Sequence, residues 1–487
     1  MSTVETAQAT MPHGETLRDK WYVRWGVLIM IALTMLFAYM FVDVLSPLKT
    51  QLDQNLGWSS SVFGTYAGSE FFINVFCLFL IFAGIILDKM GVRFTAILSG
   101  SLMVLGAGIK VYALSNTFHD GGFLYGFVSS IVPADFPPSA ALACAGFAIF
   151  GMGTEMGGVT VSRAIVKWFQ GKEMAMAMGV EMAVARLGVF AVFQSSPRIY
   201  NAMVEKFGPD MTAAQGIQAV QAPVLFVFIL LVIGLFLYLV YGVLDRKLDK
   251  QQSVTIVEDE EPFKFKDLGK VFGIKTFWIV ALLCVLYYSA IFPFQKYATN
   301  MLESNLGLST ETASSIFSLF PIGAMVITPF LGLYLDKKGK GATMLILGSI
   351  LMIVCHGIFA LYPFTTDKLS FGIAIGAIVL LGISFSLVPA ALWPSMPKVI
   401  DAKVLGSAYS ATFFIQNIGL MSVPMIIGRV LDETNPGAVA GQALNYTPAM
   451  LIFTSFGVLA LLLSLYLKAY DRKKNLGLEL PNIKKDN

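Results

Sequence analysis

Charged residues are scarce in this chain of 487 residues: they make up 13% of it, against 56% hydrophobic residues. The mean hydropathy of +0.72 excludes an ordinary soluble domain. The net charge is only +3 and no basic stripe is present, which excludes a nucleic-acid-binding surface. The four cysteines lie in apolar stretches without a CxxC pair, so we interpret them as packing residues and expect neither a metal nor a cofactor.

Long apolar runs fill most of the chain instead. Runs of about 18 or more such residues are typical of membrane-spanning helices, whereas the short alternating segments of a β-barrel are missing. We therefore predict an all-α membrane protein with twelve transmembrane helices. Their approximate ranges are 24–46, 61–87, 92–114, 139–165, 174–197, 222–244, 272–296, 310–335, 341–363, 371–396, 403–428 and 446–468.

Basic residues are unevenly distributed among the connections between these helices. They precede the first helix, follow the second, fourth, eighth and tenth, and return in the C-terminal tail, whereas residues 115–138 contain none. The positive-inside rule then predicts that both termini are cytoplasmic. The polar N-terminal segment carries Glu5 and Glu15, unlike a cleavable signal peptide.

The chain divides into two related halves. QLDQNLGWSS at 51–60 parallels MLESNLGLST at 301–310, and AGIILDKMG at 83–91 parallels LGLYLDKKG at 331–339. Repeats of this kind are typical of transporters whose substrate site lies between the halves. We predict five segments: an N-terminal tail at 1–23, six-helix bundles at 24–244 and 272–468, a cytoplasmic linker at 245–271 and a C-terminal tail at 469–487.

The two loop motifs resemble the signature of the major facilitator superfamily. The first copy comprises Gly84, Asp88, Lys89, Gly91 and Arg93, and the second comprises Gly332, Asp336, Lys337 and Gly339. The resemblance implies a fold of two six-helix bundles and a gating role for these loops. The alternative is that they are ordinary short basic turns.

Two ionisable residues lie inside apolar helices, Glu155 in AIFGMGTEMGGVTV and Arg186 in GVEMAVARLGVFAVF. A turn near Gln170–Gly171 lies midway between them, so each is about 15 residues from it, or ~22 Å along a helix. They therefore share one depth, a little beyond the middle of a ~30 Å hydrocarbon core. Charges at such a depth are costly and mark a cavity, a partner or a substrate.

Two interpretations of this pair are open. In the repeat, Glu155 aligns with Ser386 and Arg186 with Asn417, so the architecture can be built without either charge. The pair either forms a salt bridge that neutralises itself, or binds a zwitterion. In the second case Glu155 accepts an ammonium group and Arg186 clamps a carboxylate.

Other candidates are less distinctive. Asp43, near the outer end of the first helix, is either a half-solvated helix-end residue or a ligand. Tyr288 and Trp393 either pack in the core or stack on a substrate. For Lys110 and Lys296, near the outer ends of their helices, we expect the amines to reach the membrane surface.

Several stretches resemble one branch of the superfamily, the lysosomal dipeptide transporter family and its bacterial relatives. They are FGMGTEMGGVTVSRAIVKWFQGKE, MAVARLG, CVLYYSAIFPF and ALWPSMPKVIDAKVLGSAYSATFFIQNIGL. The resemblance implies facilitated diffusion of dipeptides, with the peptide termini at Glu155 and Arg186. It implies a binding site that also includes Tyr39, Asp43, Tyr288, Trp393, Gln416 and Asn417. The chain departs from that pattern at Glu70, Arg163 and Lys296.

We expect a secondary transporter that moves dipeptides or similar small zwitterions by alternating access, as a uniporter. The alternatives are a proton-coupled peptide symporter, in which Glu155, Asp43 or Glu70 titrates, and a small organic or inorganic anion exchanger. No HExxH or GxSxG motif suggests an enzyme. We expect a monomer without an accessory subunit, located in the lipid bilayer of a bacterial inner membrane.

Overall fold

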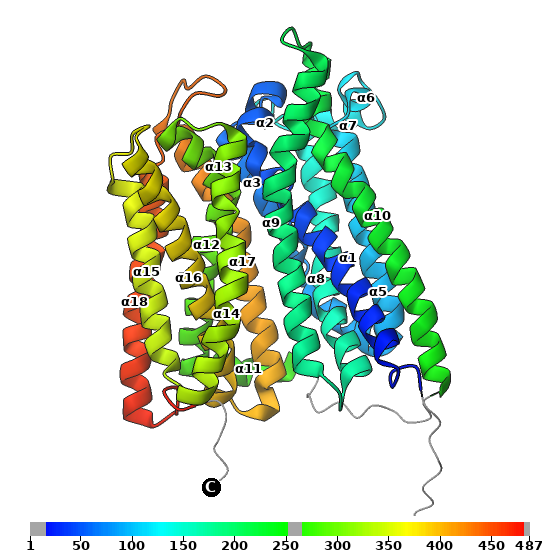
Figure 1. Cartoon of the computed structure of the whole chain (residues 1–487), viewed down its shortest axis with the longest axis vertical. Helices are drawn as coiled ribbons and strands as arrows, with labels where there is room; N and C mark the ends of the chain where they lie inside the picture. Colours follow the sequence, from blue (N-terminus) through cyan, green and yellow to red (C-terminus); the bar gives the residue numbers. More distant parts are fainter. Residues whose placement is uncertain (1–15, 252–264, 482–487) are drawn as a thin grey trace, which may run out of the picture.

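The computed structural model describes residues 16–251 and 265–481, and within these ranges the chain forms helices and no strand. The ends of the described chain lie on one side of the molecule, which we call the terminal side; the opposite side is the far side (Figure 1). The elements are α1 (Trp21–Asp43), η1 (Ser46–Leu48), α2 (Lys49–Leu56), α3 (Ser60–Ser69), α4 (Phe72–Phe76), α5 (Phe79–Ala113), α6 (Asn116–His119), α7 (Tyr125–Ile131), α8 (Pro138–Phe169), α9 (Met174–Phe207), α10 (Ala213–Gln251), α11 (Phe265–Phe272), α12 (Lys275–Leu306), α13 (Thr310–Phe317), α14 (Leu319–Lys338), α15 (Gly341–Leu361), α16 (Lys368–Val399), η2 (Ala402–Val404), α17 (Leu405–Thr434) and α18 (Thr447–Lys474).

The second predicted membrane crossing is not one helix. Within the described residues, 11 helical stretches are long and apolar enough to cross a membrane. The expected helix at 61–87 is instead divided among α3, α4 and the start of α5, with Leu78 in the left-handed region at φ 52°. The prediction of a continuous helix there is wrong, although the twelve-crossing architecture holds.

The break in this crossing has a local cause. The side-chain amide of Asn74 donates to the Gly151 carbonyl of α8 at 3.5 Å, and a Cβ on Gly151 would overlap the backbone carbonyl of Glu70. The segment therefore presses its own backbone against α8 at a position where only glycine leaves room. Two buried polar residues, Glu70 and Asn74, occupy the break.

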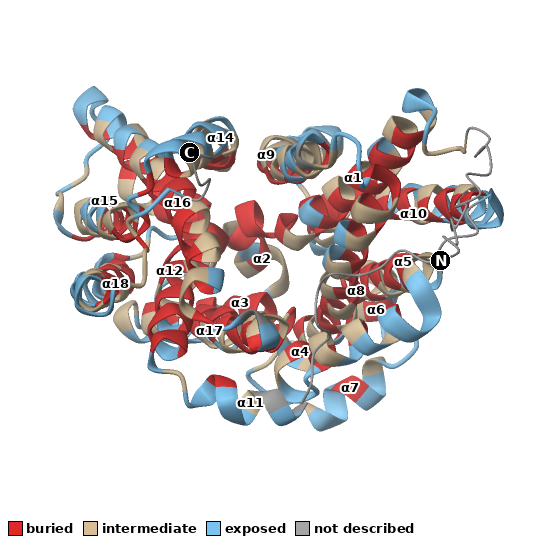
Figure 2. Ribbon diagram, turned by 90° about the horizontal axis from the view of Figure 1, so that it is seen from below, coloured by how far each residue is buried: buried red, intermediate tan, exposed pale blue. Residues whose placement is uncertain are grey.

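The helices form two groups. α1, α5, α8, α9 and α10 pack together, and so do α12 and α14–α18; the view from the terminal side shows them next to each other (Figure 2). α3 belongs to the first half of the sequence but packs along α17 of the second. The exact bundle and linker boundaries stay a proposal, because residues 252–264 lie outside the described chain.

The internal repeat extends to the helix ends. α2 ends before Gly57 at φ 65°, and α12 ends before Gly307 at φ 62°, both in the left-handed conformation that glycine adopts without strain. The next helix then begins with a serine cap: Ser59 accepts from the Val62 N–H, and Ser309 accepts from the Thr312 N–H. The similar sequences at 51–60 and 301–310 thus fold alike.

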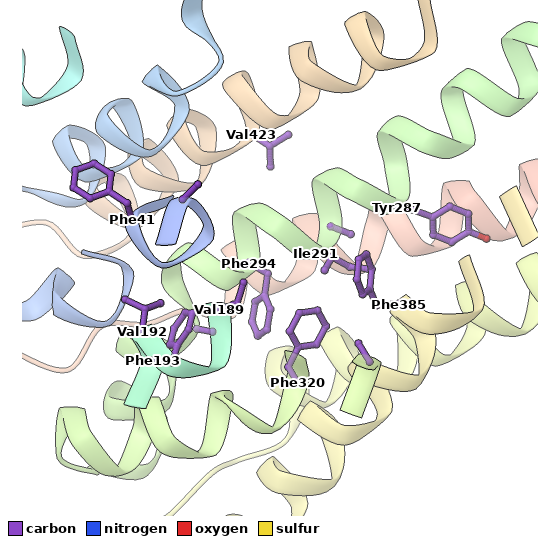
Figure 3. Close-up of a cluster of buried hydrophobic side chains, with 14 of the residues drawn as sticks. Phe41, Val189, Val192, Phe193, Tyr287, Ile291, Phe294, Phe320, Phe385 and Val423 are labelled. Carbon is purple, nitrogen blue, oxygen red and sulfur yellow. The ribbon is translucent and has the colours of Figure 1, made fainter. Parts of the chain in front are cut away.

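Apolar side chains fill the boundary between the two groups. Val189, Val192 and Phe193 of α9 lie beside Phe294 of α12 (Figure 3). The ring of Phe193 is 4.8 Å from that of Phe317 on α13. Burial of these side chains stabilises the contact of α9 with the second half.

Candidate functional site

The two charged residues lie on consecutive helices, α8 and α9. A tight turn after Phe169 joins these helices, with Gly171 in the left-handed region at φ 74°. The predicted turn near Gln170–Gly171 is confirmed. Its position leaves Glu155 and Arg186 at matching distances from the terminal side.

Glu155 faces the second half of the molecule. Its half-buried carboxylate has the side-chain amide of Asn417 on α17 as its hydrogen-bonding neighbour. Asn417 is buried, with 3% of its surface exposed. An amide N–H can donate to a carboxylate, so this contact orients Glu155 without neutralising its charge.

Arg186 also faces the second half. Its Cζ atom lies 4.6 Å from the centre of the Phe385 ring on α16, a cation–π contact. The other groups that act on its charge are Tyr39, Tyr288 and Glu181. In the described ranges, the ion pairs include neither Arg186 nor Glu155. The two residues therefore do not neutralise each other in this conformation.

These two contacts are related by the internal repeat. Asn417, which faces Glu155, is the repeat counterpart of Arg186. Phe385, which lies against Arg186, directly precedes Ser386, the counterpart of Glu155. Each contact thus places one charge of the first half against an uncharged residue of the second.

Aromatic residues of α12 and α16 form one wall near Arg186. Trp393 donates from its indole N–H to the Tyr288 hydroxyl at 3.1 Å, and its ring packs against Phe413 at 4.8 Å. Tyr39 of α1, with 38% of its surface exposed, is near enough to act on the charge of Arg186. The structure thus brings Tyr39, Arg186 and Tyr288 together, with Trp393 bound to Tyr288.

Gln416 has a different neighbour from Asn417. Its side-chain oxygen accepts from the Cys284 thiol of α12 at 3.1 Å, and 7% of the residue is exposed. Because adjacent helical residues point in different directions, Gln416 packs between α17 and α12.

Asp43 lies in a buried polar contact on the far side. Its carboxylate accepts from Lys296 at 3.0 Å and from Gln295 at 2.5 Å, both on α12, and from Ser46 at 3.0 Å. Only 1% of Asp43 is exposed. The expectation of a half-solvated helix-end residue is therefore wrong, because Asp43 is buried and three donors contact its carboxylate. Its role as a ligand stays a proposal.

The two lysines also differ from expectation. Lys296 is 7% exposed, and Lys110 is fully buried. The Lys110 amine lies 4.1 Å from the ring centre of Phe41, 4.5 Å from that of Phe147 and 5.0 Å from that of Tyr66. Neither amine reaches the membrane surface, because Asp43 accepts a hydrogen bond from Lys296 and three aromatic rings surround the amine of Lys110.

Polar residues on the far side join the two halves, and sequence reasoning missed most of them. On α12, Asn300 donates to Thr50 at 2.8 Å, and Glu303 accepts from Thr50 at 2.5 Å. On α17, Asp432 accepts from the backbone N–H groups of Ser60 and Ser61. The spacing of Lys296, Asn300 and Glu303 along one helix face is the signal that would have revealed this far-side seam.

The helix pair α3 and α17 adds a backbone contact to the far-side seam. A Cβ on Gly64 would overlap the Pro424 carbonyl, one on Gly68 would overlap the Met421 carbonyl, and one on Gly428 would overlap the Ser60 carbonyl. Glycines thus let the two helices approach closely. The molecule is closed on its far side.

The side chains of the first signature loop form ion pairs with residues of the first half. Asp88 pairs with Arg163 of α8 at 3.2 Å, and Arg93 pairs with Asp249 of α10 at 3.1 Å. Gly91 has φ 78° and lets the chain turn between two membrane crossings. Lys89 is exposed, and a Cβ added to Gly84 would meet no atom of the described chain within 4 Å.

The second signature loop is covered by the C-terminal segment 476–481. The Lys340 N–H donates to the Glu479 carbonyl at 2.9 Å, and the Gly341 N–H donates to the Leu478 carbonyl at 3.1 Å. Gly339, at φ 73°, lies so close to Glu479 that a Cβ would overlap its carbonyl. Asp336 and Lys337 precede this contact. The predicted gating role of the loop stays a proposal.

Metal-binding side chains do not gather in the part of the chain that the structure describes. No three His, Cys, Asp or Glu side chains come together there. The four cysteines are free thiols, and Cys284 and Cys355 are buried in the core.

Known proteins resemble the chain in sequence. It is 26% identical to the "Lysosomal dipeptide transporter MFSD1" of Danio rerio over 484 residues, covering 98% of this chain and 94% of the relative. It is also 26% identical to the human protein of that name over 412 residues, covering 84% and 80%.

Solved structures share the fold at low sequence identity. A "D-xylose-proton symporter" matches with TM-score 0.65 at 15% identity, covering 90% of this chain and 97% of the other. A "Bacterial Homolog to Human Lysosomal Transporter, Spinster" matches with TM-score 0.64 at 14% identity, covering 92% and 98%. The sequence pattern of the family described as "Major Facilitator Superfamily" matches residues 31–424 of this chain. The relatives and the fold are those of membrane transporters rather than enzymes, and the match over most of its length shows that the chain belongs to the Major Facilitator Superfamily.

Proposed function

We propose that this transporter moves dipeptides or similarly small zwitterions across the membrane by alternating access. Glu155 binds the substrate ammonium group, and Arg186 binds the carboxylate through its two-pronged guanidinium. Tyr39, Tyr288 and Trp393 enclose the peptide between these ends, and Asn417 orients Glu155.

One observation carries this proposal. The carboxylate of Glu155 and the guanidinium of Arg186 lie at one level between the halves, and they do not form an ion pair with each other. Both face uncharged residues of the second half, Asn417 and Phe385. Because an unpaired charge between apolar helices is costly, a ligand with the opposite charges gains from binding there. The 26% identity to dipeptide transporters of several animals supports the same substrate class.

The far side supplies the gate for such a cycle. Asp43–Lys296, Thr50–Glu303 and Ser61–Asp432 join the halves on that side. These contacts separate when the site opens to the far side. The signature loops at Asp88 and Asp336 lie on the terminal side, where we propose that they control the opposite gate.

The remaining properties follow from the sequence and stay proposals. We propose a bacterial inner membrane as the location, with both termini cytoplasmic, and a monomer without an accessory subunit. Uniport, the mode favoured by the sequence, requires that no group takes up a proton during transport. An anion exchanger is less compatible with the site, because Glu155 repels an anion bound at Arg186.

Counterflow in liposomes tests the proposed function. Purified full-length protein is reconstituted into liposomes loaded with unlabelled alanyl-alanine, and labelled alanyl-alanine is added outside. We expect labelled peptide to accumulate in protein-containing liposomes and not in protein-free ones. Counterflow of inorganic phosphate or a dicarboxylate, with none of the dipeptide, would favour the anion exchanger instead.

A further inference from the structure

A short helix on the far side, α7, has an apolar face that the proposed transport site does not use. It lies in the segment that joins α5 to α8, at the outer edge of the molecule (Figure 1, Figure 2). Phe123 is 78% exposed, Phe127 62% and Ile131 64%. Phe127 and Ile131 are four residues apart and therefore share one face of the helix. The described part of the chain leaves most of this face uncovered.

The protein holds α7 in a fixed orientation. The hydroxyl of Tyr112, at the end of α5, donates to the Phe123 carbonyl at 3.0 Å. A Cβ on Gly122 would overlap the Thr117 carbonyl, so the chain packs closely on itself just before the helix. On another face of α7, Val128 is buried in the core. The helix thus turns one apolar side chain inward and keeps the neighbouring apolar face outward.

The polar groups around this face are compatible with a lipid surface. Ser130 donates from its hydroxyl to the Phe127 carbonyl at 2.7 Å, so this hydrogen bond is made without water. Residues 115–138 contain no lysine or arginine, and the exposed Asp120 and Asp135 flank the helix. Acidic flanks repel anionic headgroups, whereas basic segments bind them. The charge pattern therefore fits a lipid surface without net charge.

The depth of α7 matches the membrane surface. α8 has 32 residues, which span about 48 Å at 1.5 Å per residue. A bilayer with its headgroups is about 40–45 Å thick, so α8 reaches from one headgroup layer to the other. α7 packs against α8 and is joined to its far end by residues 132–137. The exposed face of α7 therefore lies at the level of the far-side headgroups.

The size of the face also favours lipid over a protein partner. Leu124, which is 40% exposed, extends it. With about 200 Å² of surface for each large side chain, the four residues expose about 500 Å² together. A stable protein interface buries about 800 Å² on each partner. α4 packs against α8 as well and exposes Phe72 and Phe76, so the apolar surface continues into the membrane-crossing part of the molecule.

We propose that α7 is an interfacial anchor that inserts Phe123, Phe127 and Ile131 into the far-side lipid leaflet. The apolar side chains enter the boundary between headgroups and acyl chains. Ser129, an exposed residue on another face of the helix, stays in water. The anchor fixes the far ends of α5 and α8 at the membrane surface. It acts in this way whatever substrate the protein transports.

Site-directed spin labelling tests the inference. The full-length protein carries Cys77→Ser and Cys144→Ser, which remove the two cysteines that are not buried. Phe127→Cys, Ile131→Cys and Ser129→Cys are introduced separately, labelled with a nitroxide and reconstituted into phosphatidylcholine vesicles. Power saturation compares collisions with oxygen, which concentrates in lipid, and with the nickel complex NiEDDA, which stays in water.

We expect oxygen collisions to dominate at residues 127 and 131 and NiEDDA collisions to dominate at Ser129, the matched control on the same helix. The ratio of the two collision rates should differ several-fold between the two faces.

The contrary outcomes are distinct. NiEDDA collisions that dominate at 127 and 131 place the face in water and overturn the anchor. Low collision rates with both reagents at 127 and 131 overturn it in favour of a protein partner or a second copy of this chain. Oxygen dominance at all three positions overturns the interfacial position, because the helix then lies wholly within lipid. Ile131→Cys reports on the same face if Phe127→Cys fails to fold.

Discussion

Lys296 of α12 donates to Asp43 of α1 at 3.0 Å, so a buried ion pair connects the two halves of the transporter. Both residues are almost completely covered, and Gln295 fills the second carboxylate oxygen of Asp43. Removing one partner of a buried pair leaves the other charge without compensation. The pair therefore favours the conformation in which the far side is closed.

Lys296→Met should shift the population towards the far-open state. The expected loss is about 3–5 kcal/mol of far-closed stability, the usual cost of removing one partner of a buried pair. The measurement is maleimide labelling of a cysteine at Thr50, quantified at that site by mass spectrometry, which should be faster in the variant. Lys206→Met, which removes an exposed amine, is the control. Equal labelling rates in Lys296→Met and the wild type would show that the pair does not hold the gate.

Arg186→Lys should abolish dipeptide-induced thermal stabilisation. An ammonium cannot make the two parallel hydrogen bonds of a guanidinium to a carboxylate, although it preserves the charge. A ligand at 100 times its Kd stabilises the folded protein by about 2.7 kcal/mol, which a thermal-shift assay detects in the wild type. Arg246→Lys, at an exposed position of α10, should keep the full shift. Retention of the shift in Arg186→Lys contradicts the carboxylate-binding role.

Glu155→Gln should weaken binding of peptides with a free amino terminus. The amide preserves the shape of the side chain but removes the charge that attracts the ammonium group, and charge-assisted hydrogen bonds are about twice as strong as neutral ones. Thermal shifts of alanyl-alanine and its N-acetylated form are compared in both proteins. The wild type should prefer the free peptide, and the variant should lose most of that preference. Equal binding of both peptides to the wild type would refute the ammonium role.

Gly339→Ala should detach the C-terminal segment from the second signature loop. The positive-φ backbone of Gly339 (φ 73°, ψ −136°) alone costs about 1–3 kcal/mol for alanine, and the added methyl group also overlaps residue 479. Gly437→Ala is a matched control, because Gly437 has the same φ of 73° with no neighbour within 4 Å. Limited proteolysis after Lys474 should accelerate in Gly339→Ala only. Similar acceleration in both variants would mean that the segment does not depend on this contact.

Hydropathy and the internal repeat predicted much of the architecture. The membrane crossings follow from apolar runs, and the turn after Phe169 follows from the interruption of such runs. The shared depth of Glu155 and Arg186 follows from counting residues away from that turn. These features depend on local sequence, because a helix in a membrane satisfies its own backbone.

The tertiary environment of individual residues could not be predicted from the sequence in this way. Lys110 resembles a lysine that reaches the membrane surface, and only the packing of three helices reveals the rings around its amine. The break at Glu70 depends on the close approach to Gly151 of another helix. Averaged hydropathy contains no information about either contact.

The backbone contact between α3 and α17 bears on how easily the transporter cycles. Gly64, Gly68 and Gly428 let carbonyl groups of one helix lie directly against the backbone of the other. Two such surfaces can separate without rotamer changes in large side chains. Water can then replace the hydrogen bonds of Ser60 and Ser61 to Asp432. The two helices can therefore separate at a low free-energy cost and pack together again in each transport cycle.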